Sequence, residues 1–447
     1  MLFPESRSPH TRWPALLTKQ GTSIMSVLGQ LLLSEHLAPE QRQQLQWEQL
    51  GCVVDYARQH SPFYADRLPQ TGYTPEDFSQ VELLTRADLQ KNYESIKCQP
   101  APAAHGAVST ITSSGSTGLP IKADSTELMS LFWRCFTLRD HIWNQRDIKA
   151  TLATIKFFKK GKHEYPGTRA KSWGAWATTL APSGPTVVLN SRAPVEQQAK
   201  WLTEHQPDYL LTYPSNLDEL ASQYERHGRP PALRQLRTLG ETLQPHMREH
   251  IQRVFGAPIA DMYSAQELGY IALQCPENDH YHIQEENVYV EIIKDDGSVA
   301  PPGDVGKVVL SSLHNFVTPL IRYDIGDYAV AGRLPCSCGR THRVLDRVMG
   351  RTRNMVRLPN GDVHWPAYNP VALHALLPGA QFQLVQTAMD RVEVRVANSP
   401  IPSEPIIQKM TGIINDALGH PFELDFQAVP SVERSSGGKY EEFMSRI

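Results

Sequence analysis

The chain has 447 residues, 40% of them hydrophobic, and its 44 Lys and Arg nearly balance its 47 Asp and Glu. That length suffices for two or three domains with buried cores. A formal net charge of −3 argues against attraction of the whole protein to nucleic acid or to an anionic membrane. We therefore expect neither of them as a partner. No apolar run approaches the roughly 18–20 residues that cross a bilayer, and residues 1–25 lack the apolar segment of a signal peptide. We therefore expect a cytoplasmic protein whose first 25 residues form a ragged tail.

The order of predicted elements indicates the fold class. Residues 26–68 have helical spacing of apolar residues, and from residue 108 onward short β-rich runs alternate with helical segments such as 195–205 and 217–227. The β-rich runs are 151–155, 186–189, 209–212, 236–239 and 259–262. Such alternation predicts a mostly parallel sheet with helices on both faces.

The pattern changes in the last third of the chain. Runs 288–293 and 306–310 are typical of antiparallel strands, and Asp295-Asp296-Gly297 supplies a turn between them. Residues 355–447 have an αβ pattern of their own, with a β-like stretch at 383–396, a helix near 406–418 and a strand near 422–428. We therefore predict an α/β protein with a large N-terminal domain (1–349), containing mostly parallel sheets and a β-rich subdomain, and a small α+β C-terminal domain (350–447).

A run of small polar residues, Thr112-Ser-Ser-Gly-Ser-Thr-Gly-Leu-Pro120, follows the β-like run 108–111. Its backbone N–H groups and hydroxyls suit a polyanion such as a triphosphate. It is not a P-loop of the usual type, because no Lys-Ser/Thr pair follows its second glycine. A flexible Ser/Gly linker is the alternative interpretation.

Three further segments carry charged residues that suit nucleotide chemistry. Glu267 follows an apolar strand, where open α/β sheets collect ligands, and its carboxylate can bind Mg²⁺. The Asp327 carboxylate can accept hydrogen bonds from both ribose hydroxyls, and Lys439, on a Gly/Ser loop, can be carried into a site as a point charge. Taken singly, these residues are also explained as a solvated helix start, a β-turn and an exposed tail residue.

Taken together and in this order, the motifs resemble those of the adenylate-forming superfamily of acyl-CoA synthetases, luciferases and adenylation domains. They are most similar to the phenylacetate–CoA ligase branch, and the resemblance runs from His60-Ser-Pro-Phe-Tyr64 to Lys439. It implies ATP-dependent, Mg²⁺-assisted activation of a carboxylic acid to an acyl-adenylate with release of pyrophosphate. Transfer of the acyl group to the thiol of CoA would follow, after the mobile C-terminal domain rotates.

The resemblance also implies roles for individual residues. The phosphates would be held by Ser113, Ser114, Gly115, Ser116, Thr117 and Gly118. The adenine would lie beside Gly240, Glu241, Thr242 and Tyr263, and the ribose beside Asp327 and Arg351. The catalytic pair would be Lys439 and the magnesium ligand Glu267. The acyl pocket would be lined by Trp173, Trp176, Tyr213, Tyr263, Ser264 and Gly269, whose aromatic members favour a small aromatic acid.

The second half-reaction is less well specified. Arg353 and Arg357 stand where the family pattern usually has Asp or Lys and Lys, respectively. CoA, a carrier-protein thiol and an amine therefore all stay open as acceptors. A basic run at 156–163 suits contact with phosphopantetheine or a carrier protein, or is a solvated loop. A non-catalytic binding homologue is the third hypothesis, and the retention of both Glu267 and Lys439 speaks against it. The acid and the oligomeric state, including a homodimer, stay open.

Cysteine and histidine spacing predicts a metal centre. Cys275, Cys336 and Cys338 supply three thiolates, and His280 or His282 supplies an imidazole, which together make the Cys₃His set of structural zinc sites. The resemblance favours His282. A free Cys-x-Cys turn and a redox disulfide are the alternatives. We expect the zinc ion to brace the loop that carries Asp327.

Overall fold

The structure, a computed structural model, describes residues 4–7, 10–11, 14–70, 72, 74–112, 121–174, 179–367, 370–435 and 438–447. Several predicted site residues lie outside these ranges: Ser113, Ser114, Gly115, Ser116, Thr117, Gly118 and Trp176. None of the helices in the described ranges combines the length and the apolar character that a membrane crossing requires.

The N-terminal region consists of helices, several of which begin at a threonine cap. The predicted helical stretch is two helices, α1 (Lys19–Ser34) and α2 (Pro39–His60), separated by a short turn before the proline that begins α2. Helix α1 begins within residues 1–25, so the expected ragged tail is wrong for its last part, because Ile24 is buried in a hydrophobic core. The short helices α3 (Pro75–Ser79), α4 (Arg86–Lys91) and α5 (Tyr93–Ile96) follow, and then the 3₁₀ turn η1 (Ala103–His105). Thr85 caps α4 in a capping box with Asp88.

The centre of the molecule is one twelve-stranded mixed sheet. Its strands are β3 (Leu152–Lys156), β4 (Thr168–Ala170), β5 (Thr186–Asn190), β6 (Tyr209–Thr212), β7 (Gln235–Leu239), β8 (Ile259–Ala265), β9 (Gly269–Gln274), β10 (Tyr281–Ile283), β11 (Val288–Ile293), β12 (Val305–Ser312), β13 (Tyr323–Ala331) and β14 (Val344–Arg351). Their order is β11-β12-β13-β14-β10-β9-β8-β7-β6-β3-β5-β4. The portion from β5 to β8 is parallel, and antiparallel pairing continues the same sheet into the β-rich part. The parallel and antiparallel parts share one sheet because β9 pairs antiparallel with β8.

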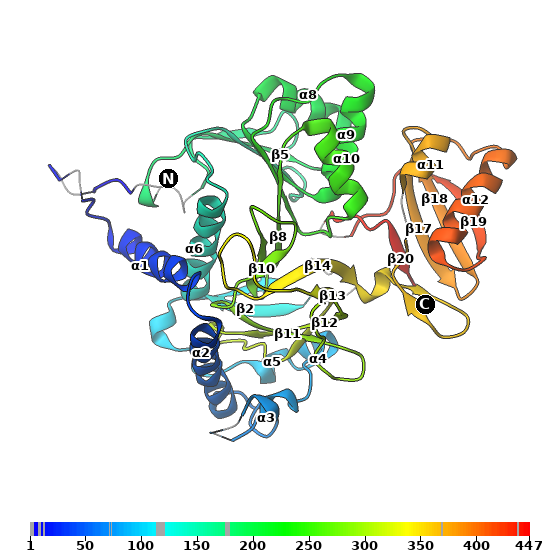
Figure 1. Ribbon diagram of the computed structural model, residues 1–447. Coiled ribbons are helices and arrows are strands. Elements are labelled where there is room, and N and C mark those ends of the chain that lie inside the picture. Colours follow the sequence, from blue (N-terminus) through cyan, green and yellow to red (C-terminus); the bar gives the residue numbers. More distant parts are fainter. Residues whose placement is uncertain are drawn as a thin grey trace.

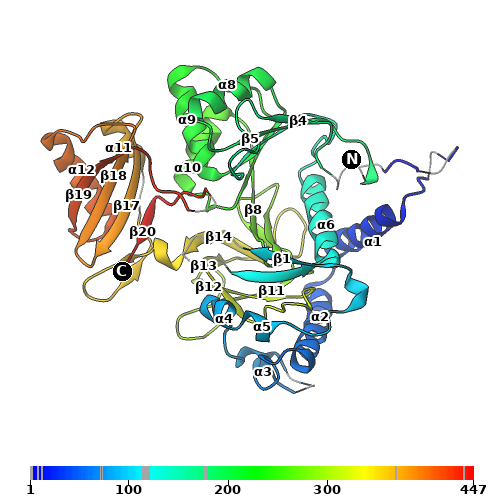
Figure 2. The same cartoon turned by 180° about the vertical axis from the view of Figure 1, so that it is seen from behind.

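Helices cover both faces of the parallel portion. On one face lie α8 (Val195–His205), α9 (Pro214–His227) and α10 (Pro245–Phe255), which share a core with Ala153 and Ile155 of β3. On the other face lie α1 and α6 (Glu127–Trp143), which pack against β8 and β9. Figures 1 and 2 show α9 and α10 on one side of β5 and α6 on the other. A separate antiparallel pair, β1 (Val108–Thr112) and β2 (Lys122–Thr126), precedes α6.

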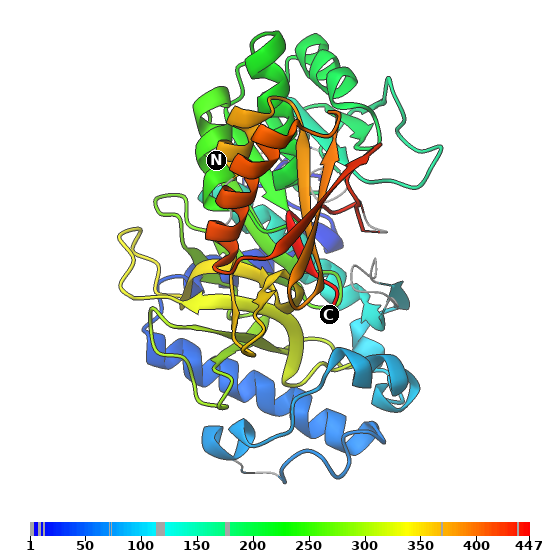
Figure 3. The ribbon, with the colours of Figure 1, turned by 90° about the vertical axis from the view of Figure 1, so that its right-hand side faces the viewer.

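The C-terminal residues form a lobe with its own core. After η2 (Thr352–Asn354) come β15 (Val356–Arg357), β16 (Val363–His364), α11 (Pro370–Leu376), β17 (Gln381–Ala388), β18 (Arg391–Ala397), α12 (Glu404–Leu418), β19 (Glu423–Val429) and β20 (Phe443–Ser445). The sheet order is β19-β18-β17-β20. The predicted β-like stretch 383–396 is a hairpin, β17–β18, on which α12 packs. Figure 3 shows this lobe, in orange and red, in front of the large sheet.

Candidate active site

A cavity of about 1060 Å³ lies between the C-terminal ends of the parallel strands and the C-terminal lobe. Parallel strands collect their ligands at this edge because the loops that follow them converge there. The sequence-predicted residues that line the cavity are Tyr213, Gly240, Glu241, Thr242, Tyr263, Ser264, Glu267, Asp327, Arg351 and Lys439. Residues that are up to 226 positions apart in sequence, from Tyr213 to Lys439, thus share one site.

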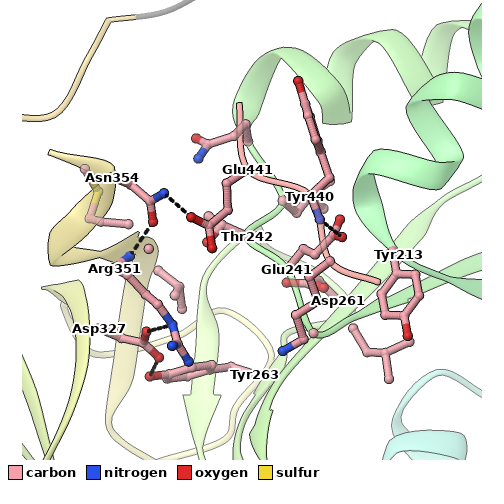
Figure 4. Close-up of a pocket in the computed structure, with 18 of the residues that line it drawn as sticks. Tyr213, Glu241, Thr242, Asp261, Tyr263, Asp327, Arg351, Asn354, Tyr440 and Glu441 are labelled. Atoms are coloured by element: carbon pink, nitrogen blue, oxygen red, sulfur yellow. Dashed lines mark hydrogen bonds and ion pairs between the residues drawn. The ribbon is translucent and has the colours of Figure 1, made fainter. Parts of the chain in front are cut away.

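Asp327 lies between residues of two other strands, to which a hydrogen bond and an ion pair join it. Tyr263 of β8 donates its hydroxyl to Asp327 Oδ2 at 2.8 Å, and Arg351 Nε of β14 lies 3.4 Å from Asp327 Oδ1. Asp327 and Arg351 face each other in the β13–β14 ladder, and Figure 4 shows the three side chains together. Burial and the Asp327 charge raise the pKa of Tyr263, so its hydroxyl stays a donor. A carboxylate has about four acceptor positions, so two remain for a further ligand beyond the contacts with Tyr263 and Arg351 in the described part of the chain.

Glu267 presents a buried carboxylate to the same cavity. Burial raises its pKa, and the charges of Arg351 and Arg86 act in the opposite direction. Within the described ranges, no cation comes within ion-pair distance of this carboxylate. Burying an unpaired carboxylate is unfavourable, and oxygen ligands of this kind are those that Mg²⁺ prefers. The surroundings of Glu267 therefore fit a cation ligand.

Lys439 enters the cavity from the C-terminal lobe. It follows Gly438, where φ is +77° and an added Cβ would lie 2.5 Å from the ring of Phe157, so only glycine fits. The lysine Cε lies close to Gly240, 3.5 Å from the position of a Cβ built there. Burial lowers the pKa of Lys439, and the Arg351 charge lowers it further.

The loop that carries Lys439 is held by Glu241. One carboxylate oxygen of Glu241 accepts a hydrogen bond from the Tyr440 backbone N–H at 2.8 Å, and the other accepts one from the Ser215 N–H at 3.1 Å. Figure 4 shows the contact between Glu241 and Tyr440. Glu241, which the sequence placed beside adenine, therefore ties the two lobes together next to the cavity.

Additional ion pairs fix the lobe in this orientation. Glu442 lies 2.9 Å from His246 Nε2 of α10, and Arg434 pairs with Glu219 of α9. Glu441 pairs with Arg353 and accepts a hydrogen bond of 3.0 Å from Asn354. Glu441 and Glu442 flank the segment that leads from Lys439 into β20, so these contacts set the position of the lysine.

The predicted metal ligands form one cluster. One ligand atom each from Cys275, His282, Cys336 and Cys338 lies within 4.8 Å of all the others. The Cys275 and Cys336 sulfurs are 3.8 Å apart, and His282 Nε2 lies 3.3 Å from the Cys338 sulfur. Zinc bonds of about 2.3 Å to sulfur and 2.0 Å to nitrogen place such atoms about 3.8 and 3.5 Å apart in a tetrahedron. The sulfurs of Cys336 and Cys338 are 3.2 Å apart and would have to separate by about half an ångström to bind zinc. The cluster therefore fits zinc.

The surroundings of this cluster distinguish its two histidines. His282 is completely buried, whereas His280 is half-buried and contacts the Cys336 sulfur through Nε2 at 3.1 Å. Asn278 donates an N–H to the same sulfur at 3.3 Å. None of the three cysteines forms a disulfide in this structure, which argues against the alternative interpretation of the cluster as a redox disulfide.

The position of the cluster corrects one expectation. Cys336 and Cys338 lie in the loop between β13 and β14, whereas Asp327 is within β13 and opposite Arg351, the last residue of β14. The eight residues of β14 span about 23 Å at 3.3 Å per residue. A metal ion there would hold the far end of this hairpin rather than a loop around Asp327.

Comparison with known proteins identifies the relatives of this chain. No family model matches it. A phenylacetate-coenzyme A ligase of Thermus thermophilus is 25% identical over 399 residues, which cover 84% of this chain and 85% of the relative. The phenylacetate-coenzyme A ligase of Escherichia coli is 27% identical over 343 residues, which cover 72% and 74%. The chain is a homologue of the phenylacetate-coenzyme A ligases.

A solved structure supports the fold of this ligase homologue. A 2-hydroxyisobutyryl-CoA ligase, solved in the postadenylation state with 2-HIB-AMP, superposes with a TM-score of 0.69 at 20% identity and covers 92% of this chain and 91% of that one. The ligase homologue therefore has the fold of this CoA ligase, which confirms the predicted α/β class. The predicted resemblance to the phenylacetate–CoA ligases is confirmed by the sequence relatives.

Two predicted pocket residues of the ligase homologue lie elsewhere. Trp173 is a core residue that packs against Tyr209 and donates its indole N–H to the Ala150 carbonyl at 2.8 Å. Gly269 lines a neighbouring cavity of about 410 Å³. Trp133 of α6 lines both cavities and was not among the predicted pocket residues. No local pattern singles out this tryptophan, because a large apolar residue on a helix is usually part of the core.

Proposed function

We propose that this ligase homologue uses ATP to convert a small carboxylic acid to an acyl-adenylate and then to a CoA thioester, in the cytosol. The observation that carries the proposal is the convergence of Asp327, Glu267 and Lys439 on one cavity. The phenylacetate-coenzyme A ligases among its relatives support both the reaction class and CoA as the acceptor.

The nucleotide would occupy the part of the cavity around Asp327. We assign its two remaining acceptor positions to the ribose hydroxyls, and Arg351 and Tyr263 hold the carboxylate in place for them. Residues 240–242 and the ring of Tyr263 would border the adenine. Glu267 would be a ligand of Mg²⁺, which neutralises phosphate charge when bound. The assignment of residues 113–118 to the phosphates rests on the sequence.

The first half-reaction requires positioning and charge rather than a protein nucleophile. A carboxylate oxygen of the acid attacks the α-phosphorus, and the bond from that phosphorus to the oxygen of the β-phosphate breaks. Pyrophosphate leaves with the bonding electrons. Lys439 would donate to the oxygens on which charge accumulates, and Glu241 holds its loop in place for this step.

The second half-reaction needs a different arrangement of the lobes. The thiol sulfur of CoA attacks the acyl carbon, the bond to the AMP oxygen breaks, and the thiol proton goes to solvent. With Lys439 and residues 440–443 lining the cavity, the C-terminal lobe occupies one side of it. We propose that the lobe rotates after adenylation, which separates the ion pairs Glu442–His246 and Arg434–Glu219.

We further propose that Cys275, His282, Cys336 and Cys338 hold a structural zinc ion. The distances between their ligand atoms support four-coordinate zinc with no open position. Zinc would link β10 and the segment after β9 to the β13–β14 loop. Its contribution would be to the stability of the hairpin that carries Asp327 and Arg351.

Pyrophosphate release across a panel of carboxylic acids, with and without CoA, tests the proposed function. We expect ATP-dependent release with at least one acid, and faster steady-state release when CoA removes the adenylate. Release with no acid would overturn the enzymatic assignment. Release that is unaffected by CoA, with no thioester formed, would reject CoA as the acceptor.

A further inference from the structure

Lys156 is a partly buried cation that the proposed mechanism does not use. It is the last residue of β3, at the strand end where ligands bind, and its side chain lines the large cavity. Ala153 and Ile155 face the core beneath α8, α9 and α10. Because side chains alternate along a strand, Lys156 lies on the opposite face, which α6 covers.

The lysine is separate from the basic run in which the sequence places it. Lys159, Lys160 and Lys162 are exposed on the loop after β3, whereas the Lys156 side chain is partly buried. Only Lys156 of these four lines the cavity. The basic run is therefore not one surface, and its first member belongs to the site.

No acidic group neutralises Lys156 within the described ranges. Burial lowers its pKa, and the charged side chain that acts on it is another cation, Arg237. Arg237 is itself paired with Asp140 at 2.8 Å. Two carboxylates that line the same cavity have other partners. Glu241 binds backbone N–H groups, and Asp261 accepts hydrogen bonds from the hydroxyls of Thr238 and Tyr281.

A partly buried ammonium group without an acceptor among the described residues is unfavourable unless a ligand supplies one. The neighbouring walls are aromatic, because Tyr213 follows the adjacent strand β6 and Trp133 projects from α6 into the same cavity. This arrangement suits a planar acid with an anionic group directed at the lysine. Lys439 reaches the cavity from the other lobe and is assigned to the oxygens on which charge accumulates during adenylation.

We propose that Lys156 determines substrate specificity by binding a second carboxylate, so that the preferred substrates are aromatic dicarboxylic acids. This inference rests on the proposed function and specifies its substrate class. Lys156 would position the acid through the carboxylate that does not react. A site that pairs a charged substrate group rejects analogues without it, because its own charge is then left unpaired.

Matched acids test the inference. Phenylacetate and benzoate are compared with their ring-carboxylated counterparts in wild type and in Lys156→Met, which removes the charge and keeps most of the length of the side chain. We expect wild type to favour the best diacid over its matched monoacid by about 30-fold or more in kcat/KM. Lys156→Met should abolish that preference and leave the monoacid within a few-fold, and Lys156→Arg should restore part of it.

The exposed Lys159→Met variant is the matched control and should retain the wild-type preference. Equal losses for both acids in Lys156→Met, or a wild-type preference for monoacids, would overturn the inference. If no acid supports pyrophosphate release, the proposed function fails. The inference is then decided by calorimetry, where tighter diacid binding to wild type than to Lys156→Met supports it and equal binding overturns it. Melting temperatures of all variants check folding.

Discussion

Removal of the Lys439 charge should strongly slow adenylate formation. In the structure this lysine enters the cavity on a loop that Glu241 holds from the opposite lobe. A unit charge about 4 Å from a phosphate oxygen contributes about 4 kcal/mol at an effective dielectric constant of about 20. Because each 1.36 kcal/mol is roughly a factor of ten, Lys439→Ala should lower the rate of pyrophosphate release by about 1000-fold.

The assay separates the two half-reactions. Pyrophosphate release measures adenylation, and conversion of a synthetic acyl-adenylate to the thioester measures the second step. We expect the second rate to change by less than about fivefold, because the rotated lobe no longer uses the lysine. The exposed Lys409→Ala in α12 is the control and should leave both rates unchanged. Unchanged pyrophosphate release, or equal losses in both steps, would refute the assigned role.

The remaining predictions concern pH, metal and ribose binding. Because burial lowers the pKa of Lys439 from its ordinary 10.5, adenylation should fall as pH rises through that lowered pKa. Lys439→Arg should move this limb of the rate profile to higher pH, and an identical limb in both proteins would contradict the assignment. Protein purified without chelator should contain about one zinc per chain, and Cys336→Ser should lose it and lower Tm by more than about 5 °C. Cys52→Ser, at an exposed free cysteine, should keep both properties, and a zinc-free wild type with the same Tm would reject the metal. Asp327→Asn should lower kcat/KM for ATP by about 10- to 100-fold, since hydrogen bonds to charged groups contribute about 1.5–3 kcal/mol. The control Asp425→Asn, at an exposed position, should leave kcat/KM unchanged. An unchanged kcat/KM in Asp327→Asn would argue against ribose binding by Asp327.

Local patterns predicted individual elements well. The run 209–212 is strand β6, and the segment 195–205 is helix α8. Their patterns are local, because apolar spacing is set by the burial of one face. The sequence did not predict that the parallel and antiparallel parts share one sheet. That outcome depends on pairing of β9 with β8 and of β10 with β14, and the second of these joins residues about 60 positions apart.

Some candidate site residues could be predicted from local motifs, and others depend on how the chain folds. Asp327, Glu267 and Lys439 were found because each belongs to a recognisable motif and the motifs occur in order. Trp173 was misplaced because aromatic density does not distinguish a cavity wall from a core. Lys156 was grouped with neighbouring lysines because charge runs are visible in sequence. The structure shows that Lys156 is the last residue of β3 and lines the cavity, and the run of charges in the sequence does not reveal this.

Transfer of oxygen from the acid to AMP tests the central claim most directly. The acid is labelled with ¹⁸O in its carboxylate and incubated with ATP, CoA and the enzyme. Attack of the carboxylate on the α-phosphorus predicts one ¹⁸O atom in the AMP for each thioester formed, and none in pyrophosphate. Label in inorganic phosphate with formation of ADP, or AMP without label, would contradict an acyl-adenylate intermediate.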